Sequence, residues 1–180
     1  MVQDYRDNPV LARALRYWRA KRGRREMPRR RDIDPTEIVP LLPHLQLIDV
    51  VEGGARYRYR LVGTSLVTAF GREYTGTYLD ELLTAERLAN AQRVYGAVVA
   101  RRKPVFLRNR YNTTLDVEMI ANRLYMPLSA DGRTVNLILG ALTFDWGRGA
   151  VAGMWSGASL DPSSASIEII EDEDLAALPA

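Results

Sequence analysis

The sequence contains no cysteine and only one histidine, His44. Without cysteine there are no disulfides, thiolate nucleophiles, thiolate metal sites or cysteinyl-flavin adducts. One histidine excludes a multi-histidine metal site and any Ser-His-Asp triad that uses another base. We find no nucleophile–base pair and no glycine-rich phosphate loop, so we expect a protein that is not an enzyme.

Long apolar runs are also missing. No stretch approaches the roughly 20 apolar residues that cross a bilayer, and Met1 to Arg16 lacks the uninterrupted apolar core of a signal peptide. We therefore expect a cytoplasmic protein without a membrane span. A chain of 180 residues with 47% hydrophobic residues is expected to form one domain with one core.

Charge is distributed unevenly along the chain. Residues 1–31 hold eleven Arg or Lys against three acids, whereas 161–180 hold six acids and no base. The two ends could attract each other or bind different partners, although blocks of like charge are most often solvated segments. We divide the chain into an N-terminal helix with a basic connector (1–31), a folded domain (32–146) and an acidic, poorly ordered tail (147–180), with at most a short strand at 166–170.

An amphipathic helix is predicted after Asn8-Pro9, since Asn caps helices and Pro suits their first position. Its apolar face, at i, i+3, i+4 and i+7 spacing, consists of Leu11, Ala14, Leu15 and Trp18. Gly23 ends it, and an arginine-rich connector follows.

The remaining pattern predicts an α+β fold. A hairpin is expected over 45–61 with its turn at Glu52-Gly53-Gly54, and three further strands over 105–111, 117–128 and 135–146. Between them lie short helices and one long helix that starts at Thr84, stops before Pro104 and turns Arg87 away from its apolar face. A short helix capped by Asp34, with Glu37 as its capping-box acid, precedes the hairpin.

Several residues in this order resemble the bacterial PAS-like family that occurs mostly as stand-alone proteins in alphaproteobacteria and was long a domain of unknown function. The likeness covers about residues 10 to 145. It is carried by Trp18 and Lys21, Asp34-Pro35, Leu41-Leu42-Pro43-His44-Leu45, Ile48-Asp49-Val50, Tyr59-Arg60-Leu61-Val62-Gly63-Thr64, Thr75-Gly76, and Leu128 with Asp131-Gly132.

The resemblance implies a PAS-like, five-stranded antiparallel sheet with the short helices and the long helix on one face, and a small cavity between them. Such cavities hold haem, flavin, organic acids or other small molecules. The residues expected nearest this cavity are Tyr59, Leu61, Thr64, Phe70, Tyr78, Arg60, Arg108, Tyr125 and Leu137.

The resemblance also implies a sensory or regulatory module whose N-terminal helix supports dimerisation. Leu11, Ala14, Leu15 and Trp18 are then the dimer-helix candidates, with a homodimer and signalling proteins such as histidine kinases as partners. The ligand class stays open: a small organic molecule or a non-covalent flavin fits better than haem, because His44 lies before the first strand rather than on a cavity helix.

Two other interpretations remain. The arginine-rich start could neutralise phosphates of a nucleic acid, and the core could be filled, giving a ligand-free interaction domain. The arginine stripe of the second strand (Arg56, Arg58, Arg60) and its counterpart on the third (Arg108, Arg110) could bind an anion or form a solvated face.

Overall fold

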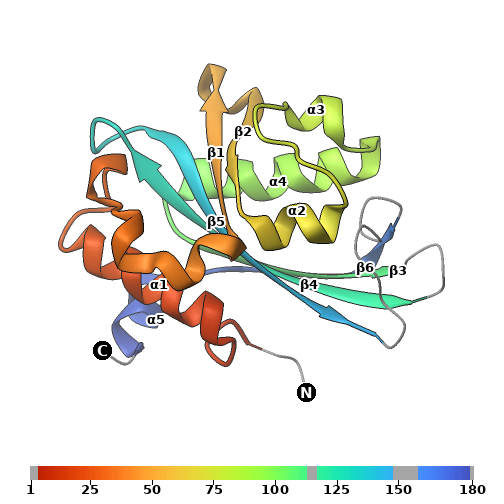
Figure 1. Ribbon diagram of the computed structural model, residues 1–180. Coiled ribbons are helices and arrows are strands. Elements are labelled where there is room, and N and C mark those ends of the chain that lie inside the picture. The colour runs from red at the N-terminus through yellow and green to blue at the C-terminus, as the bar shows by residue number, and fades with distance from the viewer. Residues whose placement is uncertain (1–3, 113–116, 148–157, 179–180) are drawn as a thin grey trace.

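The core of the fold is one antiparallel sheet with the strand order β2-β1-β5-β4-β3-β6 (Figure 1). It is seen in a computed structural model that describes residues 4–112, 117–147 and 158–178. The strands are β1 (Leu45–Val51), β2 (Arg56–Val62), β3 (Val105–Asn112), β4 (Glu118–Ser129), β5 (Val135–Trp146) and β6 (Ser159–Ile169).

Helices cover both sides of this sheet. The α-helices are α1 (Pro9–Arg22), α2 (Thr64–Phe70), α3 (Leu79–Leu82), α4 (Ala85–Arg101) and α5 (Asp172–Ala177), and the 3₁₀ helices are η1 (Arg30–Asp32), η2 (Pro35–His44) and η3 (Glu52–Gly54). In Figure 1, α2, α3 and α4 lie on one side, which we call the cavity face, and α1 and α5 on the other, the outer face.

Helix α1 begins and ends where the sequence predicts. The Asn8 side chain accepts from the backbone N–H groups of Val10 and Leu11, and Gly23 follows the last turn with a φ of 58°. The expected apolar face is buried against the sheet of the same chain, and the Trp18 indole donates to the Pro127 carbonyl at 2.8 Å. This corrects the predicted dimer surface: Leu11, Ala14, Leu15 and Trp18 are all at most 2% exposed within the chain itself.

The sheet has six strands in the described residues, one more than expected. β6 pairs with β3, with Val105 opposite Ile169 and Tyr111 opposite Leu160. The prediction of a five-stranded sheet is therefore wrong, because β6 adds a sixth strand at the edge. The acidic composition of this segment suggested a poorly ordered tail, but apolar side chains at its end are buried, among them Ile170 and Leu175.

Helix α5 then pairs with the basic start of the chain. Arg22 bonds to Asp172 at 2.6 Å and Arg6 to Asp174 at 2.8 Å, while Lys103 pairs with Glu171 and Asp172. We call these pairs the terminal clasp. The two oppositely charged ends therefore attract each other across the outer face, one of the two outcomes that the charge pattern allowed.

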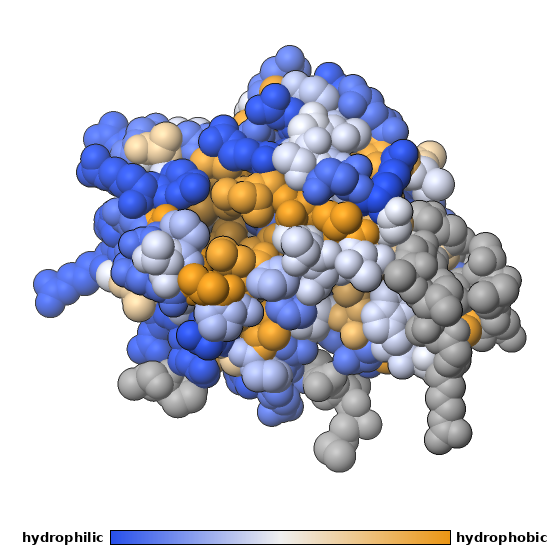
Figure 2. Space-filling view, in the orientation of Figure 1, coloured by the Kyte–Doolittle hydropathy of each residue, from blue (hydrophilic) through white to orange (hydrophobic). Residues whose placement is uncertain are grey.

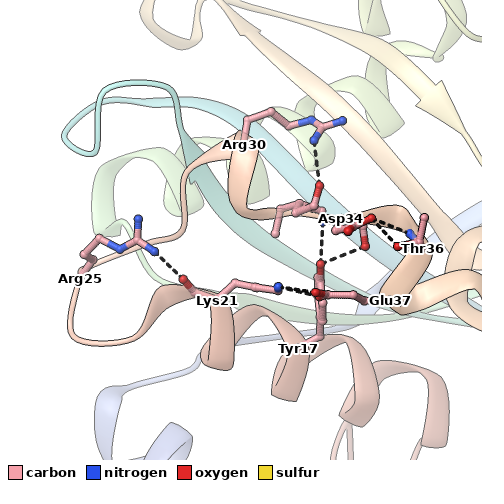
Figure 3. A network of polar contacts seen from close by, with 8 residues as sticks. Tyr17, Lys21, Arg25, Arg30, Asp34, Thr36 and Glu37 are labelled. Carbon is pink, nitrogen blue, oxygen red and sulfur yellow. Dashed lines mark hydrogen bonds and ion pairs between the residues drawn. The ribbon is translucent and has the colours of Figure 1, made fainter.

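Polar contacts also join α1 to η2, on either side of the basic connector (Figure 3). The Tyr17 hydroxyl accepts from the Asp34 N–H at 2.8 Å, and Lys21 pairs with Glu37, which therefore does not act as the expected capping-box acid. Asp34 does cap η2, accepting from Thr36 N–H at 2.9 Å. These internal pairs use part of the positive charge that a nucleic acid would need.

Close backbone packing joins η2 to the start of α2. A Cβ at Gly63 would lie 2.4 Å from the carbonyl oxygens of Leu42 and Pro43, so glycine permits this approach. Figure 2 shows apolar surface in the middle of this view, across the region where η2, β2 and α2 meet in Figure 1. Val39 on η2 and Leu61 on β2 are exposed apolar residues, at 58% and 45%.

Candidate ligand cavity

A small cavity lies between the cavity face of the sheet and helices α2, α3 and α4. Its volume is about 30 Å³, room for about two water molecules. The described residues that line it are Gln46, Tyr59, Phe70, Tyr74, Leu82, Leu83, Arg87, Asn90, Ala91, Val94, Tyr95, Leu107, Tyr111, Arg123, Tyr125 and Leu142.

Strand register builds the floor of the cavity. Arg123 of β4 lies between Leu107 of β3 and Leu142 of β5, and all three side chains line the cavity. Gly140 is opposite Tyr125 and leaves the space that neighbouring side chains occupy: a Cβ there would lie 2.8 Å from Gln46 Cγ and 3.2 Å from the Tyr125 ring. Glycine thus lets Gln46 and Tyr125 meet over the floor.

Arg123 is the central polar group of this floor, and it is only 7% exposed. Its Nη2 donates to Asn109 Oδ1 at 2.6 Å and to the Tyr111 hydroxyl at 2.7 Å. Its buried Nε and the buried Nδ2 of Asn109 have no hydrogen-bond partner in the described part of the chain. No Asp or Glu is among the described lining residues, so none of these residues places a carboxylate beside the buried guanidinium charge.

A second arginine enters the cavity from the start of α4. Arg87 is 9% exposed, and its Nη2 donates to the Ala158 carbonyl at 2.6 Å. The guanidinium carbons of Arg87 and Arg123 lie 5.3 Å and 5.4 Å from the centre of the Tyr111 ring. Both cations therefore share one aromatic ring.

Burial and neighbouring groups set the protonation of these arginines. Burial lowers the pKa of Arg87, and the positive charge of Arg123 lowers it further. Burial also disfavours the charged form of Arg123, but the surrounding tyrosine oxygens outweigh it and raise the pKa of Arg123 above its ordinary value. Arg123 is therefore a permanent cation in the cavity floor.

Four tyrosines form much of the remaining wall. Tyr59 packs edge-on against Tyr74, and Tyr95 against Tyr125, with ring centres 4.8 Å apart in both pairs. Burial raises the pKa of all four hydroxyls. Each therefore stays neutral near pH 7 and can donate a hydrogen bond to a ligand.

The structure brings three of the predicted pocket residues into the cavity: Tyr59, Phe70 and Tyr125. Leu61 and Thr64 are instead exposed, Thr64 being the first residue of α2 after Gly63 at the cap. Leu61 follows a register shift between β1 and β2, which breaks the simple alternation on which its placement rested.

The other four predicted pocket residues also lie outside the lining of this cavity. Arg60 and Leu137 belong to the outer face, where Arg60 pairs with Asp49 at 2.7 Å. Tyr78 stacks under Arg56 at 3.8 Å from the ring centre. Arg108 alternates with the cavity-lining Leu107, so it points to the opposite side of β3.

The sequence interpretation missed the two cavity arginines. Strand alternation could have found Arg123, because it stands two residues before Tyr125 and shares its face. Arg87 was assigned to the solvent side of its helix, which is wrong: it is one turn before Ala91 and two before Val94, and all three line the cavity. Arginine is rarely buried, so a sequence pattern alone favours the surface for both residues.

Neither of the large cofactors considered fits this cavity. Ligand pockets usually measure about 300–1,000 Å³, several times the volume here, so a flavin would require rearrangement of the wall. His44, the only imidazole, ends η2 and does not line the cavity, which gives haem no histidine ligand there.

Other site types concern the described ranges 4–112, 117–147 and 158–178. These ranges contain no cluster of three His, Asp or Glu side chains suited to a metal ion. No helix within them is both long enough and apolar enough to cross a membrane.

Comparison with known families agrees with this architecture. A search of curated proteins finds no match to the chain. The profile of the PAS domain matches residues 6–143, which include α1, the described cavity lining, strands β1 to β4 and most of β5. This confirms the resemblance seen in the sequence: the chain belongs to the PAS domain family.

Proposed function

We propose that this protein is a sensory module that binds a small molecule in the cavity and signals by changing its association with a partner. The observation that carries the proposal is the polar interior around Arg123 in an otherwise apolar core. Buried polar groups without partners destabilise a fold, and a ligand that pairs with them explains why they are there.

The proposal assigns no catalysis to the cavity. PAS domains typically act as sensory or interaction modules rather than as enzymes. Among the described residues that line the cavity there is no Ser, Thr, Lys, His or carboxylate, so no nucleophile with a neighbouring base is present in that set.

Strand β4 offers a physical link from the cavity to the outer face. Arg123 faces the cavity, and four residues later the Pro127 carbonyl accepts the hydrogen bond of Trp18 in α1. A ligand on Arg123 would act on this strand and so on the packing of α1. We propose that the resulting shift alters contacts with a second copy of the chain or with a signalling protein such as a histidine kinase.

The first test is to purify the protein natively, identify retained small molecules by mass spectrometry, and screen metabolites by thermal shift. Ala91→Phe is the comparison variant, because Ala91 lines the cavity from α4 and a larger side chain would fill it. We expect a compound that is retained by, or stabilises, the natural protein and not the filled variant. If no compound does so, the cavity is not a binding site.

Light scattering with and without that compound tests the signalling step. A change in molar mass, or in mass of a complex with a candidate kinase, is expected upon ligand binding. An unchanged mass in every case would contradict signalling by association.

A further inference from the structure

We propose that the ligand of this cavity is a small organic carboxylate and that Arg123 is the residue that binds its anionic group. This inference rests on the proposed function and names its ligand class. It follows from the unsatisfied donors in the floor, from the charge of the described lining residues and from the shape of the cavity.

The donors of Arg123 are only partly used. Nη2 bonds to two neutral acceptors, Asn109 and Tyr111, while the buried Nε has no partner among the described residues. A carboxylate pairs with a guanidinium through two parallel hydrogen bonds, one of which commonly uses Nε. An anion at this point would satisfy the open donor and neutralise the buried charge.

Charge around the floor favours an anion over a neutral or cationic ligand. The described lining contains two arginines and no carboxylate, and its tyrosines stay neutral because burial raises their pKa. A cation would be repelled, and a neutral ligand would leave the Arg123 charge unmatched in a low-dielectric interior.

The rest of the wall favours a carboxylate rather than phosphate. Opposite the floor, α4 supplies the polar groups of Arg87, Asn90 and Tyr95. The other helix side chains of the wall are apolar, among them Phe70, Leu82 and Val94. Phosphate carries oxygens on every side and would leave some of them against this surface without donors. A short aliphatic carboxylate presents oxygens to Arg123 and hydrocarbon to the helices, and a volume of about 30 Å³ limits it to a few heavy atoms.

The test uses propionate, its neutral near-isostere propionamide, and inorganic phosphate. Each is titrated into the full chain, and binding is followed by calorimetry and by backbone amide shifts in NMR spectra. We expect saturable binding of propionate, with propionamide at least about tenfold weaker, the loss expected when a charge-assisted hydrogen bond is removed. Phosphate should also bind at least about tenfold more weakly, because some of its oxygens would lack donors.

Variants then assign the effect to Arg123. Arg123→Gln should weaken propionate binding at least about tenfold, and Arg123→Lys, which keeps charge but loses the planar fork, should weaken it less. Arg60→Gln is the matched control, since Arg60 is also a strand arginine but pairs with Asp49 on the outer face. It should bind propionate as the natural protein does.

The possible outcomes distinguish failure of the carboxylate assignment from failure of the proposed sensory function. Equal binding of propionamide and propionate, tighter binding of phosphate, or unchanged binding in Arg123→Gln would overturn the carboxylate assignment and leave a ligand-binding cavity standing. The first two comparisons need only the natural protein, so they decide the matter even where a variant does not fold. Failure of both these titrations and the metabolite screen against Ala91→Phe would overturn the proposed function as well.

Discussion

Arginines on the two faces of the sheet differ in burial and in their hydrogen-bond partners. On the outer side of β2, Arg58 and Arg60 share the carboxylate of Asp49, at 2.8 Å and 2.7 Å. On the cavity side of β4, Arg123 is more deeply buried and donates to the Asn109 amide and the Tyr111 phenol, and no carboxylate is among its hydrogen-bond partners in the described residues.

This difference separates a structural role from a binding role. A partly exposed ion pair costs little to form and contributes little. A buried cation without a carboxylate is costly and is therefore most readily explained by a ligand that supplies the missing charge. Substitutions on each side of the sheet distinguish a structural outer face from a binding cavity face.

The largest effect is expected on the outer face. Trp18→Ala should lower the free energy of unfolding by about 3–5 kcal/mol, because it leaves a large void in the core beneath α1, where Trp18 is fully buried and bonds to Pro127. Urea unfolding measures it, with the exposed Arg13→Ala on the same helix as control. A loss below about 1 kcal/mol would show that α1 does not pack on this sheet in solution.

On the cavity face, Gly140→Ala should destabilise by about 1–3 kcal/mol through overpacking, because the new Cβ would meet Gln46 and Tyr125. Gly96→Ala is the control: Gly96 lies within α4 with open space around its Cα, so alanine should be neutral or stabilising there. Thermal or urea unfolding of both variants measures the difference. Equal effects would mean that the cavity floor is not tightly packed.

A smaller effect, of opposite sign on the two faces, is expected from replacing each of two buried asparagines of the sheet by aspartate. Asn109→Asp should stabilise by about 1 kcal/mol, because it sets an anion against Arg123 and replaces an Nδ2 that has no described partner. It should also weaken propionate binding, since the anionic position is already taken. Arg123 should hold the pKa of the introduced carboxyl low, so the gain is present above about pH 4 and lost as the pH falls further.

Asn122→Asp is the outer-face counterpart. Asn122 donates to Asp145 at 2.8 Å, so this change puts two carboxylates together and should destabilise at neutral pH. Urea unfolding at pH 7 and pH 4 measures both variants. Stabilisation by both, or by neither, would contradict the distinction between the faces.

The smallest effect is expected at the terminal clasp. Hydrogen bonds from Arg22 and Lys103 lower the pKa of Asp172, so its contribution to stability is present above its unfolded pKa and is lost as the pH falls through the lowered folded value. Asp172→Asn should cost less than about 1 kcal/mol, because the pair is exposed, and salt should reduce that cost.

Hydrogen exchange of the α5 amides at pH 7 and pH 3 measures the clasp. Glu173→Gln is the matched control, since Glu173 lies on the same helix and forms no ion pair within the described ranges. Faster exchange in Asp172→Asn alone is expected. Equal exchange in both variants would show that the clasp does not hold α5.

Much of the fold could be predicted from local pattern. Alternation and glycine turns located five strands, and the Asn8 cap and Gly23 bounded α1 correctly. What the pattern could not specify was the partner of an apolar face: Trp18 had to be buried, but the same spacing fits a second chain or the chain's own sheet. For the sixth strand, Ser159–Ile169, the sequence predicts only a short segment at 166–170, because the acidic surroundings outweigh a short apolar alternation.

The cavity was harder to predict because it departs from the usual rules. Tyr59 and Tyr125 follow from strand alternation, whereas Arg123 and Arg87 contradict the expectation that arginine stays at the surface. Departures of this kind are expected at functional sites. Alternation applied to charged residues as strictly as to apolar ones would have placed Arg123 in the cavity.

The most direct test of the account is the NMR signal of the Arg123 Nε–H group, assigned with the Arg123→Lys variant and followed during titration with propionate. The account predicts that this proton shifts downfield, as a new hydrogen bond forms, in step with the amides of the cavity strands, and that propionamide does not produce the shift. A signal that stays in place while propionate binds would contradict the assignment of Arg123 as the anion-binding residue.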